Sequence, residues 1–238
     1  MKRVLVTGGS RGLGLAICER LLRDDWQVVT TSRHLTPALK RLGEAHPGRF
    51  EYYAADLSSP EDREHLCRSA RVLHGLDGFV ANAAIGTEGL LTLLSESAIR
   101  EGIEVNLLAT VLLTRQVVKG MLSRGGSLVF ISSVAARTGF SGLSVYAATK
   151  GALGSFSRAV AREYGGRGIR ANCILPGFLE TEMSATLSAS NKERIRRRTA
   201  LRRLGTVDEV VGAVRFLLSE EARYITGSEL TIDGGLAS

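Results

Sequence analysis

The feature that most constrains this chain is an alternation of short apolar runs with longer amphipathic runs over its whole length. The apolar runs have the length and composition of strands and lie at 3–9, 26–33, 50–58, 76–84, 126–134, 169–177 and 229–233. Helical spacing of apolar residues occupies 13–25, 60–74, 95–123, 145–165 and 207–219. Strands that alternate with helices predict an α/β fold with a parallel sheet and helices on both faces. In such a doubly wound sheet, ligands bind beyond the carboxyl ends of the strands.

Composition argues for one globular domain over residues 1–238. The chain is 44% hydrophobic and 23% charged, and no linker or repeat divides it. Its apolar runs are too short to span a bilayer, and its start reaches glycine too soon for a signal peptide, so we expect no membrane segment and a cytoplasmic location. The three cysteines, Cys18, Cys67 and Cys173, have no close spacing, and the four histidines form no ligand pattern. We therefore expect neither a disulfide framework nor a metal site.

A glycine-rich loop joins the first expected strand to the first expected helix. In TGGSRGLG (residues 7–14), Gly8, Gly12 and Gly14 allow a tight turn and a close approach of the backbone to a diphosphate. The N-terminus of the following helix adds N–H donors and the positive end of its dipole. A plain turn is the alternative, but the position between strand and helix favours a dinucleotide site, although the spacing G-x-x-x-G-x-G is not the commonest fingerprint.

Arginine stands where an NAD-binding fold usually places an acid. That acid lies about 20 residues beyond the loop, at the end of the second strand, and binds the ribose 2′-hydroxyl. Here the second strand ends TTSR with Arg33, and Arg11 lies within the glycine loop. Two guanidinium groups suit a 2′-phosphate and so favour NADP(H). A solvated surface position is the alternative for Arg33 taken alone.

A serine, a tyrosine and a lysine follow in an order that suits proton transfer to a carbonyl. Ser133 ends the strand-like run ISSV, and YAATK places Tyr146 and Lys150 four residues apart on one helix face. The ammonium of Lys150 is expected to lower the pKa of Tyr146. Tyr146 then donates a proton to the substrate oxygen, which the hydroxyl of Ser133 holds. A lone Y-x-x-x-K carries no information, but after a nucleotide loop and a strand-end serine it does.

These motifs resemble the short-chain dehydrogenases/reductases, which have a single-domain Rossmann-type fold. The resemblance covers essentially the whole chain: the loop 7–14, ANAA at 81–84, Asn106, Ser133, Tyr146 with Lys150, and PG at 176–177. More narrowly, PGFLETEM, LGTVDEV and YITGSELTIDGG look like the 3-oxoacyl-[acyl-carrier-protein] reductases of bacterial fatty acid synthesis.

The resemblance implies a catalytic tetrad of Asn106, Ser133, Tyr146 and Lys150. Tyr146 would be the general acid, and Lys150 would hold the nicotinamide ribose and tune the tyrosine. Ser133 would orient the substrate carbonyl. Asn106 would anchor a water that refills the proton relay.

The resemblance also implies the positions of the cofactor contacts. Asp56 and Leu57 would contact the adenine, Asn82 would support the sheet and the cofactor, and Thr181 would bond the carboxamide. The full set of expected NADP(H)-binding residues is Thr7, Gly8, Ser10, Arg11, Gly12, Leu13, Gly14, Arg33, Asp56, Leu57, Asn82, Ala83, Tyr146, Lys150, Pro176, Gly177, Leu179 and Thr181.

Two departures from the family pattern bear on the loop and the substrate. ANAA replaces the usual N-N-A-G, so Ala81 and Ala84 stand for an Asn and a Gly, from which we expect only a local change. Leu143 stands three residues before Tyr146, where carrier-protein reductases often have a polar residue. The substrate pocket is therefore expected to be more apolar.

Positive charge is concentrated in KERIRRRTALRR at 192–203. Seven of its twelve residues are Lys or Arg and one is Glu, so it carries 7 − 1 = +6 of the chain's net charge of +7. By the resemblance, 184–203 would be a flexible substrate lid. Arg124 and Arg167 would join arginines of this segment, drawn from the set Arg194, Arg196, Arg197, Arg198 and Arg202, in a patch that docks an acidic acyl carrier protein or a CoA thioester. A solvated helix face is the alternative. Nucleic acid is excluded as a partner, since no aromatic residues interleave with the charge and no recognition motif is present.

The leading functional prediction is an NADPH-dependent reductase of 3-oxoacyl thioesters. A reductase of a polyketide, an aryl polyene, another secondary-metabolite ketone or a free ketone is the alternative within the fold. A non-catalytic dinucleotide sensor is the alternative from another class, but it would be expected to lack part of the tetrad. The resemblance implies a homotetramer, and the helical segments 95–123 and 145–165 carry more apolar residues than one sheet face needs.

Overall fold

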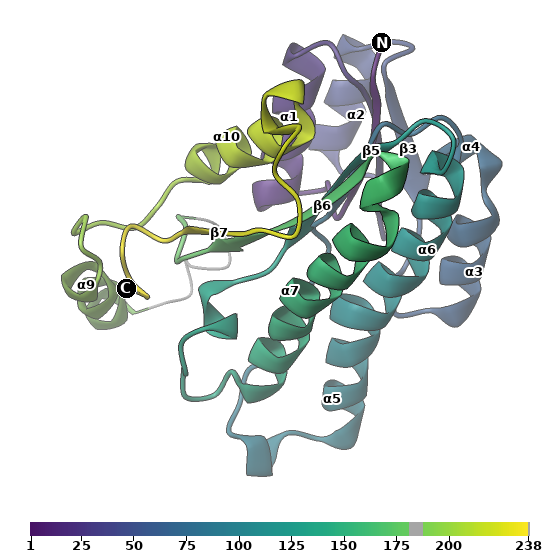
Figure 1. Ribbon diagram of the computed structural model, residues 1–238. Helices are drawn as coiled ribbons and strands as arrows, with labels where there is room; N and C mark the ends of the chain where they lie inside the picture. Colours follow the sequence, from purple (N-terminus) through teal and green to yellow (C-terminus); the bar gives the residue numbers. More distant parts are fainter. Residues whose placement is uncertain (181–187, 238) are drawn as a thin grey trace.

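The computed structural model describes residues 1–180 and 188–237 and has a central sheet of seven parallel strands (Figure 1). The strand order is β3-β2-β1-β4-β5-β6-β7, and every neighbouring pair is parallel. The strands are β1 (Arg3–Thr7), β2 (Gln27–Ser32), β3 (Phe50–Ala54), β4 (Gly78–Ala81), β5 (Gly126–Ile131), β6 (Ile169–Pro176) and β7 (Glu229–Ile232). The predicted α/β, doubly wound arrangement is confirmed.

Helices connect the strands and cover both faces of the sheet (Figure 1). The α-helices are α1 (Gly12–Arg23), α2 (Pro37–Ala45), α3 (Pro60–Arg68), α4 (Ala70–Leu73), α5 (Glu96–Ile103), α6 (Ala109–Met121), α7 (Ser144–Tyr164), α9 (Ala189–Arg198) and α10 (Val207–Leu218). A π-helix, η2 (Glu104–Leu108), joins α5 to α6. Short 3₁₀ turns occupy η1 (Leu91–Leu93), η3 (Val134–Ala136), η4 (Gly165–Arg167) and η5 (Glu220–Ala222). In the part of the chain described here, no helix combines the length and the hydropathy of a membrane span.

Two apolar cores lie on opposite faces of the sheet because successive side chains of each strand alternate between them. On β1, Val4 and Val6 pack with residues of α1 and α10, whereas Leu5 packs with residues of α6 and α7. β4 repeats the division, with Val80 in the first core and Phe79 in the second. Strands that are buried on both faces read as continuous apolar runs, which is why the sequence pattern predicts their positions.

The chain reverses its direction across the sheet between β1 and β4. β1 pairs with β2 on one side and with β4 on the other, so the loops that follow β1 and β4 leave in opposite directions. Such a switch point opens a crevice at the carboxyl ends of the strands. The glycine loop and the ANAA segment both begin there.

Besides α9, which lies within the segment expected to be a flexible lid, the helical segments differ from the sequence-based expectation in three places. α2 was not expected, although Thr36 accepts a hydrogen bond from the backbone N–H of Leu39 and Pro37 occupies the first turn, which are ordinary helix-start signals. The segment 60–74 is interrupted at Ser69, whose side chain caps α4. The segment 95–123 is not uniformly α-helical, because η2 widens one turn in its middle.

Thr7 ties β1 to β4 at the switch point. Its buried hydroxyl oxygen accepts hydrogen bonds from the backbone N–H groups of Asn82 and Ala83, both at 3.0 Å. The side-chain amide of Asn82 donates back to the carbonyl oxygens of Thr7 at 2.9 Å and of Gly8 at 3.2 Å. The two loops that begin at the switch point are thereby held in one relative position.

We predict that Thr7→Val destabilises the protein by about 2–4 kcal/mol, because it leaves two backbone N–H groups without an acceptor in a largely buried position. Thr31→Val is the matched control: Thr31 lies beside Thr7 on β2, it is 1% exposed, and its hydroxyl has no hydrogen-bond partner. That substitution should be neutral or stabilising. Urea denaturation of the two variants measures both effects, and equal losses would contradict the assigned role of Thr7.

Candidate active site

The glycine loop has the geometry of a phosphate cradle. Gly8 and Gly12 adopt positive φ angles of 72° and 53°, which non-glycine residues rarely adopt. A Cβ on Gly14 would overlap the carbonyl oxygen of Gly8 and lie 2.6 Å from the amide nitrogen of Asn82, so the turn requires glycine there. Among residues 1–180 and 188–237, a Cβ on Gly12 would meet nothing within 4 Å, so these residues leave open space above the N-terminus of α1. Thr36 supports the loop by donating to the carbonyl oxygen of Ser10 at 3.3 Å.

The expected adenosine contacts gather at the carboxyl ends of β2 and β3. Arg33 is exposed directly after β2, and Asp56 and Leu57 follow β3. Partial burial raises the pKa of Asp56, but hydrogen bonds from the backbone and hydroxyl of Ser58 and the nearby charge of Arg33 outweigh it and lower the pKa overall. Asp56 is therefore an ionised acceptor beside Arg33. Arg11 is exposed at the N-cap of α1, within the glycine loop.

β5 and α7 position three of the four expected catalytic residues. Ser133 caps the 3₁₀ turn after β5, and its hydroxyl accepts the N–H of Ala135 at 3.2 Å. Tyr146 and Lys150 lie one turn apart near the start of α7, with the lysine Nζ 5.8 Å from the centre of the tyrosine ring. The Lys150 ammonium is 2% exposed and donates to the carbonyl oxygen of Ile131 at 2.7 Å.

Burial controls the ionisation of both titrating groups. It raises the pKa of Tyr146, and although a hydrogen bond with Ser133 lowers that pKa in part, the carboxylate of Glu88 raises it further. Burial also lowers the pKa of Lys150 to about 8. The expectation that Lys150 depresses the pKa of Tyr146 is therefore wrong for the protein alone, because loss of hydration dominates at both positions. Tyr146 is a neutral phenol at pH 7 and so holds the proton that a general acid must give.

Asn106 lies in the π-helix η2 and is 1% exposed. Its side-chain oxygen Oδ1 accepts the backbone N–H of Ile85 at 2.8 Å, and its side-chain amide nitrogen Nδ2 donates to the backbone carbonyl oxygen of Ile85 at 3.0 Å. The amide also donates to the hydroxyl of Thr149 at 3.2 Å, and that hydroxyl donates to the carbonyl oxygen of Tyr146 at 2.8 Å. Asn106 is thus joined to the catalytic helix through Thr149. π-Turns of this kind are frequent at functional sites.

The segment after β6 forms one wall of the crevice, where the nicotinamide is expected. The N–H of Gly177 donates to the carbonyl oxygen of Ile232 at 2.8 Å, and a Cβ on Gly177 would lie 2.7 Å from the Cα of Asp233. Leu179 forms an isolated parallel bridge with Gly205. Pro176, Gly177 and Leu179 therefore line one wall together, whereas Thr181 lies outside the described residues.

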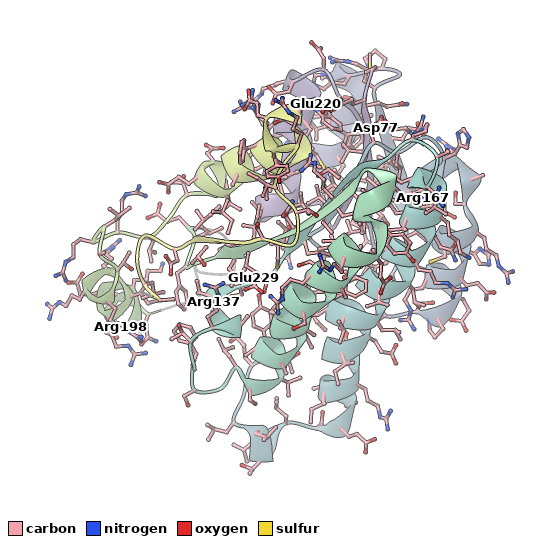
Figure 2. All side chains as sticks on the ribbon, viewed as in Figure 1. Asp77, Arg137, Arg167, Arg198, Glu220 and Glu229 are labelled. Carbon is pink, nitrogen blue, oxygen red and sulfur yellow. The ribbon has the colours of Figure 1, made fainter. Side chains whose placement is uncertain are left out.

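Arg124 and Arg167 lie at the opposite edge of the sheet from Tyr146. They precede β5 and β6, so they stand at the amino ends of those strands, and Arg124 is 3.9 Å from the carboxylate of Asp77. From Tyr146 to the far end of α7 is about 27 Å at 1.5 Å per residue. Figure 2 shows Arg167 beside that end of α7 and Arg198 on α9, on opposite sides of the molecule. Within one chain the expectation of a single patch that unites these arginines with 192–203 is wrong, because they lie at different ends of the fold.

The basic segment forms α9 and the turn that follows it. Ile195 is its buried anchor, and Arg197 pairs with Glu193 at 3.0 Å. Arg198 lies over the ring of Phe140, 5.9 Å from its centre, and Phe140 packs edge-on against Phe178 with centres 5.6 Å apart. Two of the positive charges, those of Arg197 and Arg198, therefore make local contacts within the chain. The first residues of the expected lid, up to residue 187, lie outside the described residues.

Sequence reasoning missed several residues that support the site. Thr149 lies within YAATK, next to Lys150, and is buried, but its burial is visible only in the structure. Ser132 donates to the carbonyl oxygen of Lys150 at 2.7 Å and is the first serine of ISSV. Glu88 acts on Tyr146 from the loop after β4, and no local pattern distinguishes it from other surface acids.

Comparisons with known proteins agree with this geometry. A family model described as enoyl-(acyl carrier protein) reductase matches residues 8–237. Nodulation protein G of Rhizobium sp. (strain N33) is 36% identical, over 99% of this chain and 97% of that protein. Dehydrogenase/reductase SDR family member 4 of Oryctolagus cuniculus is 37% identical, over 100% and 94%. The 3-oxoacyl-[acyl-carrier-protein] reductase of Salmonella typhimurium is 35% identical, over 99% and 97%.

Two solved structures with a bound nicotinamide dinucleotide superpose on nearly the whole chain. A 4-hydroxyisoleucine dehydrogenase complexed with NADH has a TM-score of 0.93 at 26% identity and covers 99% of this chain and 98% of its own. A blue fluorescent protein from a metagenomic library, in complex with NADPH, has a TM-score of 0.91 at 33% identity and covers 100% and 98%.

We predict that the stability cost of burying Lys150 depends on pH. Below about pH 8 the lysine is charged in both the folded and the unfolded chain, so the cost is fully present. As the pH rises from about 8 to 10.5, only the unfolded chain binds the proton. The free energy of unfolding of the wild type should therefore increase by up to about 3 kcal/mol relative to that of Lys150→Met.

Denaturant titrations of both proteins between pH 7 and pH 10.5 measure this difference. Lys119 is exposed on α6, so Lys119→Met is the control and should show no such trend. A constant difference between wild type and Lys150→Met would contradict the assigned burial penalty.

Proposed function

The chain belongs to the short-chain dehydrogenases/reductases, an oxidoreductase family, and from that premise we propose that it is an NADPH-dependent reductase of 3-oxoacyl thioesters. The observation that carries the proposal is the placement of Ser133, Tyr146 and Lys150 at the carboxyl edge of the sheet, beside an open glycine loop. A family oxidoreductase of this kind uses a nicotinamide dinucleotide.

The described residues fit the dinucleotide as a whole. The open space above Gly12 and the N-terminus of α1 would take the diphosphate, and the hydrogen bonds of Asn82 keep that loop in place. Arg33 and Arg11 support NADP(H) over NAD(H), because Arg33 is exposed directly after β2, Arg11 is exposed in the glycine loop, and no acid ends β2. The solved neighbours hold NADH in one case and NADPH in the other, so the family alone does not choose between them.

The chain's own residues supply the proton and the orientation. When bound, the nicotinamide provides a hydride for the carbonyl carbon. Tyr146, neutral at pH 7, donates its phenolic proton to the carbonyl oxygen, which the hydroxyl of Ser133 holds within reach. Lys150 would hold the nicotinamide ribose, and when it is charged it would favour the phenolate left on Tyr146. Asn106 and Thr149 fix the turn of α7 on which Tyr146 stands.

An apolar rim supports a substrate with an acyl chain. Phe140, Leu143 and Phe178 are half-buried near the start of α7, and Phe140 and Phe178 contact one another. The likeness to a 3-oxoacyl-[acyl-carrier-protein] reductase and the matched family model support a thioester on a carrier protein or on CoA. The likeness to nodulation protein G and to dehydrogenase/reductase SDR family member 4 leaves reduction of a secondary-metabolite ketone as the second candidate. A homotetramer and docking of an acidic carrier at Arg124 and Arg167 belong to the same proposal.

A substrate panel tests the proposed function. The 3-oxoacyl thioesters linked to carrier protein, to CoA and to short pantetheine mimics should oxidise NADPH faster than free ketones do. Tyr146→Phe should lower kcat about 10²–10⁴-fold, because it removes the general acid, and should leave the Kd for NADPH within about threefold. Absorbance at 340 nm and NADPH fluorescence measure the two quantities.

Each outcome of the panel separates the candidates. Turnover confined to free ketones would favour the second candidate, and binding of dinucleotide without turnover of any substrate would favour a sensor. Full activity of Tyr146→Phe would overturn the assigned mechanism.

We predict that Arg33→Asp changes the cofactor preference. The acid would repel the 2′-phosphate and accept hydrogen bonds from a free ribose hydroxyl, so kcat/KM for NADPH should fall about 10–100-fold while that for NADH holds or rises. Arg23→Asp is the control, since Arg23 is exposed at the far end of α1. An unchanged ratio of the two cofactors in Arg33→Asp would show that Arg33 does not contact the phosphate.

A further inference from the structure

Arg63 is a buried arginine on the inner face of α3. It is 6% exposed and lies one turn before Leu66, which belongs to the core between the sheet and α6. An arginine is rarely buried without paired and hydrogen-bonded contacts, because the loss of its hydration is costly. Its Nε has no hydrogen-bond partner among the described residues, and the contacts that hold the guanidinium are made by its terminal nitrogen Nη1.

The terminal nitrogen of Arg63 joins two segments that are far apart in sequence. Nη1 lies 2.7 Å from the carbonyl oxygen of Leu57 and 2.9 Å from that of Ser58, on the loop after β3. The same Nη1 lies 3.0 Å from the carboxylate of Glu104, the first residue of the π-helix η2. Its two N–H bonds are therefore shared among three acceptors on two segments.

Each of these segments carries a residue of the proposed site. Asp56 precedes Leu57 on the adenosine side, and Ser58 donates both its N–H and its hydroxyl to the Asp56 carboxylate. Asn106 follows Glu104 by two residues and is joined through Thr149 to the backbone of Tyr146. Hydrogen bonds thus run from the adenosine loop through Arg63 to Glu104, the backbone of η2 links Glu104 to Asn106, and hydrogen bonds continue from Asn106 to α7.

We propose that Arg63 is a positioning residue that couples occupancy of the adenosine pocket to the π-helix that holds Asn106. The proposal rests on the assignment of Asp56, Leu57 and Asn106 to the cofactor and catalytic sites. Adenosine binding fixes the loop 56–58, the two loop carbonyl oxygens fix the guanidinium, and the guanidinium fixes Glu104 and the first turn of η2. The expected result is that the adenosine half of the cofactor, which does not reach the nicotinamide side, orders Asn106.

A purely structural role is the competing explanation, and Arg3 provides a matched control for it. Arg3 is a half-buried arginine that pairs with Glu51 at 3.2 Å and donates to the carbonyl oxygens of His74 and Arg71. Its Nε also lacks a partner. It lies at the amino end of β1, at the opposite edge of the sheet from the site. Arg3→Met therefore removes a similar set of contacts without touching either segment.

The test measures hydrogen exchange of the full chain with and without adenosine 2′,5′-bisphosphate, with ADP as a parallel probe. In the wild type and in Arg3→Met, the adenosine probe should slow exchange at the Ile85 N–H and within 104–110 at least threefold. In Arg63→Met this remote protection should be lost, while protection near 56–58 persists at a saturating probe concentration. Arg63→Lys should restore part of it, because the ammonium still reaches the carbonyl oxygens of the loop.

Kinetics give a second readout. Arg63→Met should raise KM for NADPH about tenfold and lower kcat about threefold, whereas Arg3→Met should change neither by more than twofold at a similar loss of Tm. Equal remote protection in wild type and Arg63→Met would overturn the coupling, and so would equal kinetic losses in the two methionine variants.

Failure of the proposed function is recognised separately. A wild type that is inactive on 3-oxoacyl thioesters but still shows Arg63-dependent protection by either probe would contradict the proposed substrate class and support the coupling. Protection by ADP but not by the bisphosphate would contradict only the NADP assignment. Absence of protection near 56–58 in the wild type with both probes would overturn the adenosine site and the coupling with it.

Discussion

The reversal of the sheet at β1 and β4 is the constraint on which the rest of the site depends. Thr7 and Asn82 hold the two diverging loops together with four hydrogen bonds. The glycine loop opens on one side of this junction, and β4 leads to the loop that carries Ile85 and Glu88 on the other. Because parallel strands present all their carboxyl ends at one edge, Ser133 at the end of β5 and Pro176 at the end of β6 meet the same crevice.

The ionisation of the proposed catalytic pair, Tyr146 and Lys150, is governed by dehydration rather than by a simple attraction between charges. Lys150 is buried against the carbonyl oxygen of Ile131, where its charge is costly, and Tyr146 is kept protonated beside it. A bound nicotinamide ribose would give the ammonium further acceptors and so restore part of the lost hydration. The buried charge lowers the stability of the fold at this helix, and it brings the pKa of Lys150 down toward neutrality while Tyr146 keeps its proton.

Most of the fold and the core of the site follow from local sequence rules, and the remainder depends on contacts between distant segments. Apolar runs in the sequence predict the strands that are buried on both faces, and the glycine spacing and the Y-x-x-x-K turn have fixed local geometry. No local rule places Arg63 against Glu104, 41 residues away, or Thr149 against Asn106. The pKa of Tyr146 is raised and not lowered as the sequence predicts, because burial is a property of the assembled core. The expectation of a single patch of Arg124, Arg167 and the arginines of 192–203 was wrong for one chain, because a run of charged residues does not indicate at which edge of the sheet it will lie.

The π-helix has a consequence for comparing this chain with others. A π-turn contains one residue more than an α-turn, and each residue advances an α-helix by about 100°. A relative without the extra residue would continue as a regular α-helix and would turn its counterpart of Asn106 away from Ile85. An alignment across α5 and α6 would then need a gap inside a continuous helix rather than in a loop. A chain that keeps its counterpart of Asn106 in this position would therefore have one residue more within 104–108 than a chain that does not.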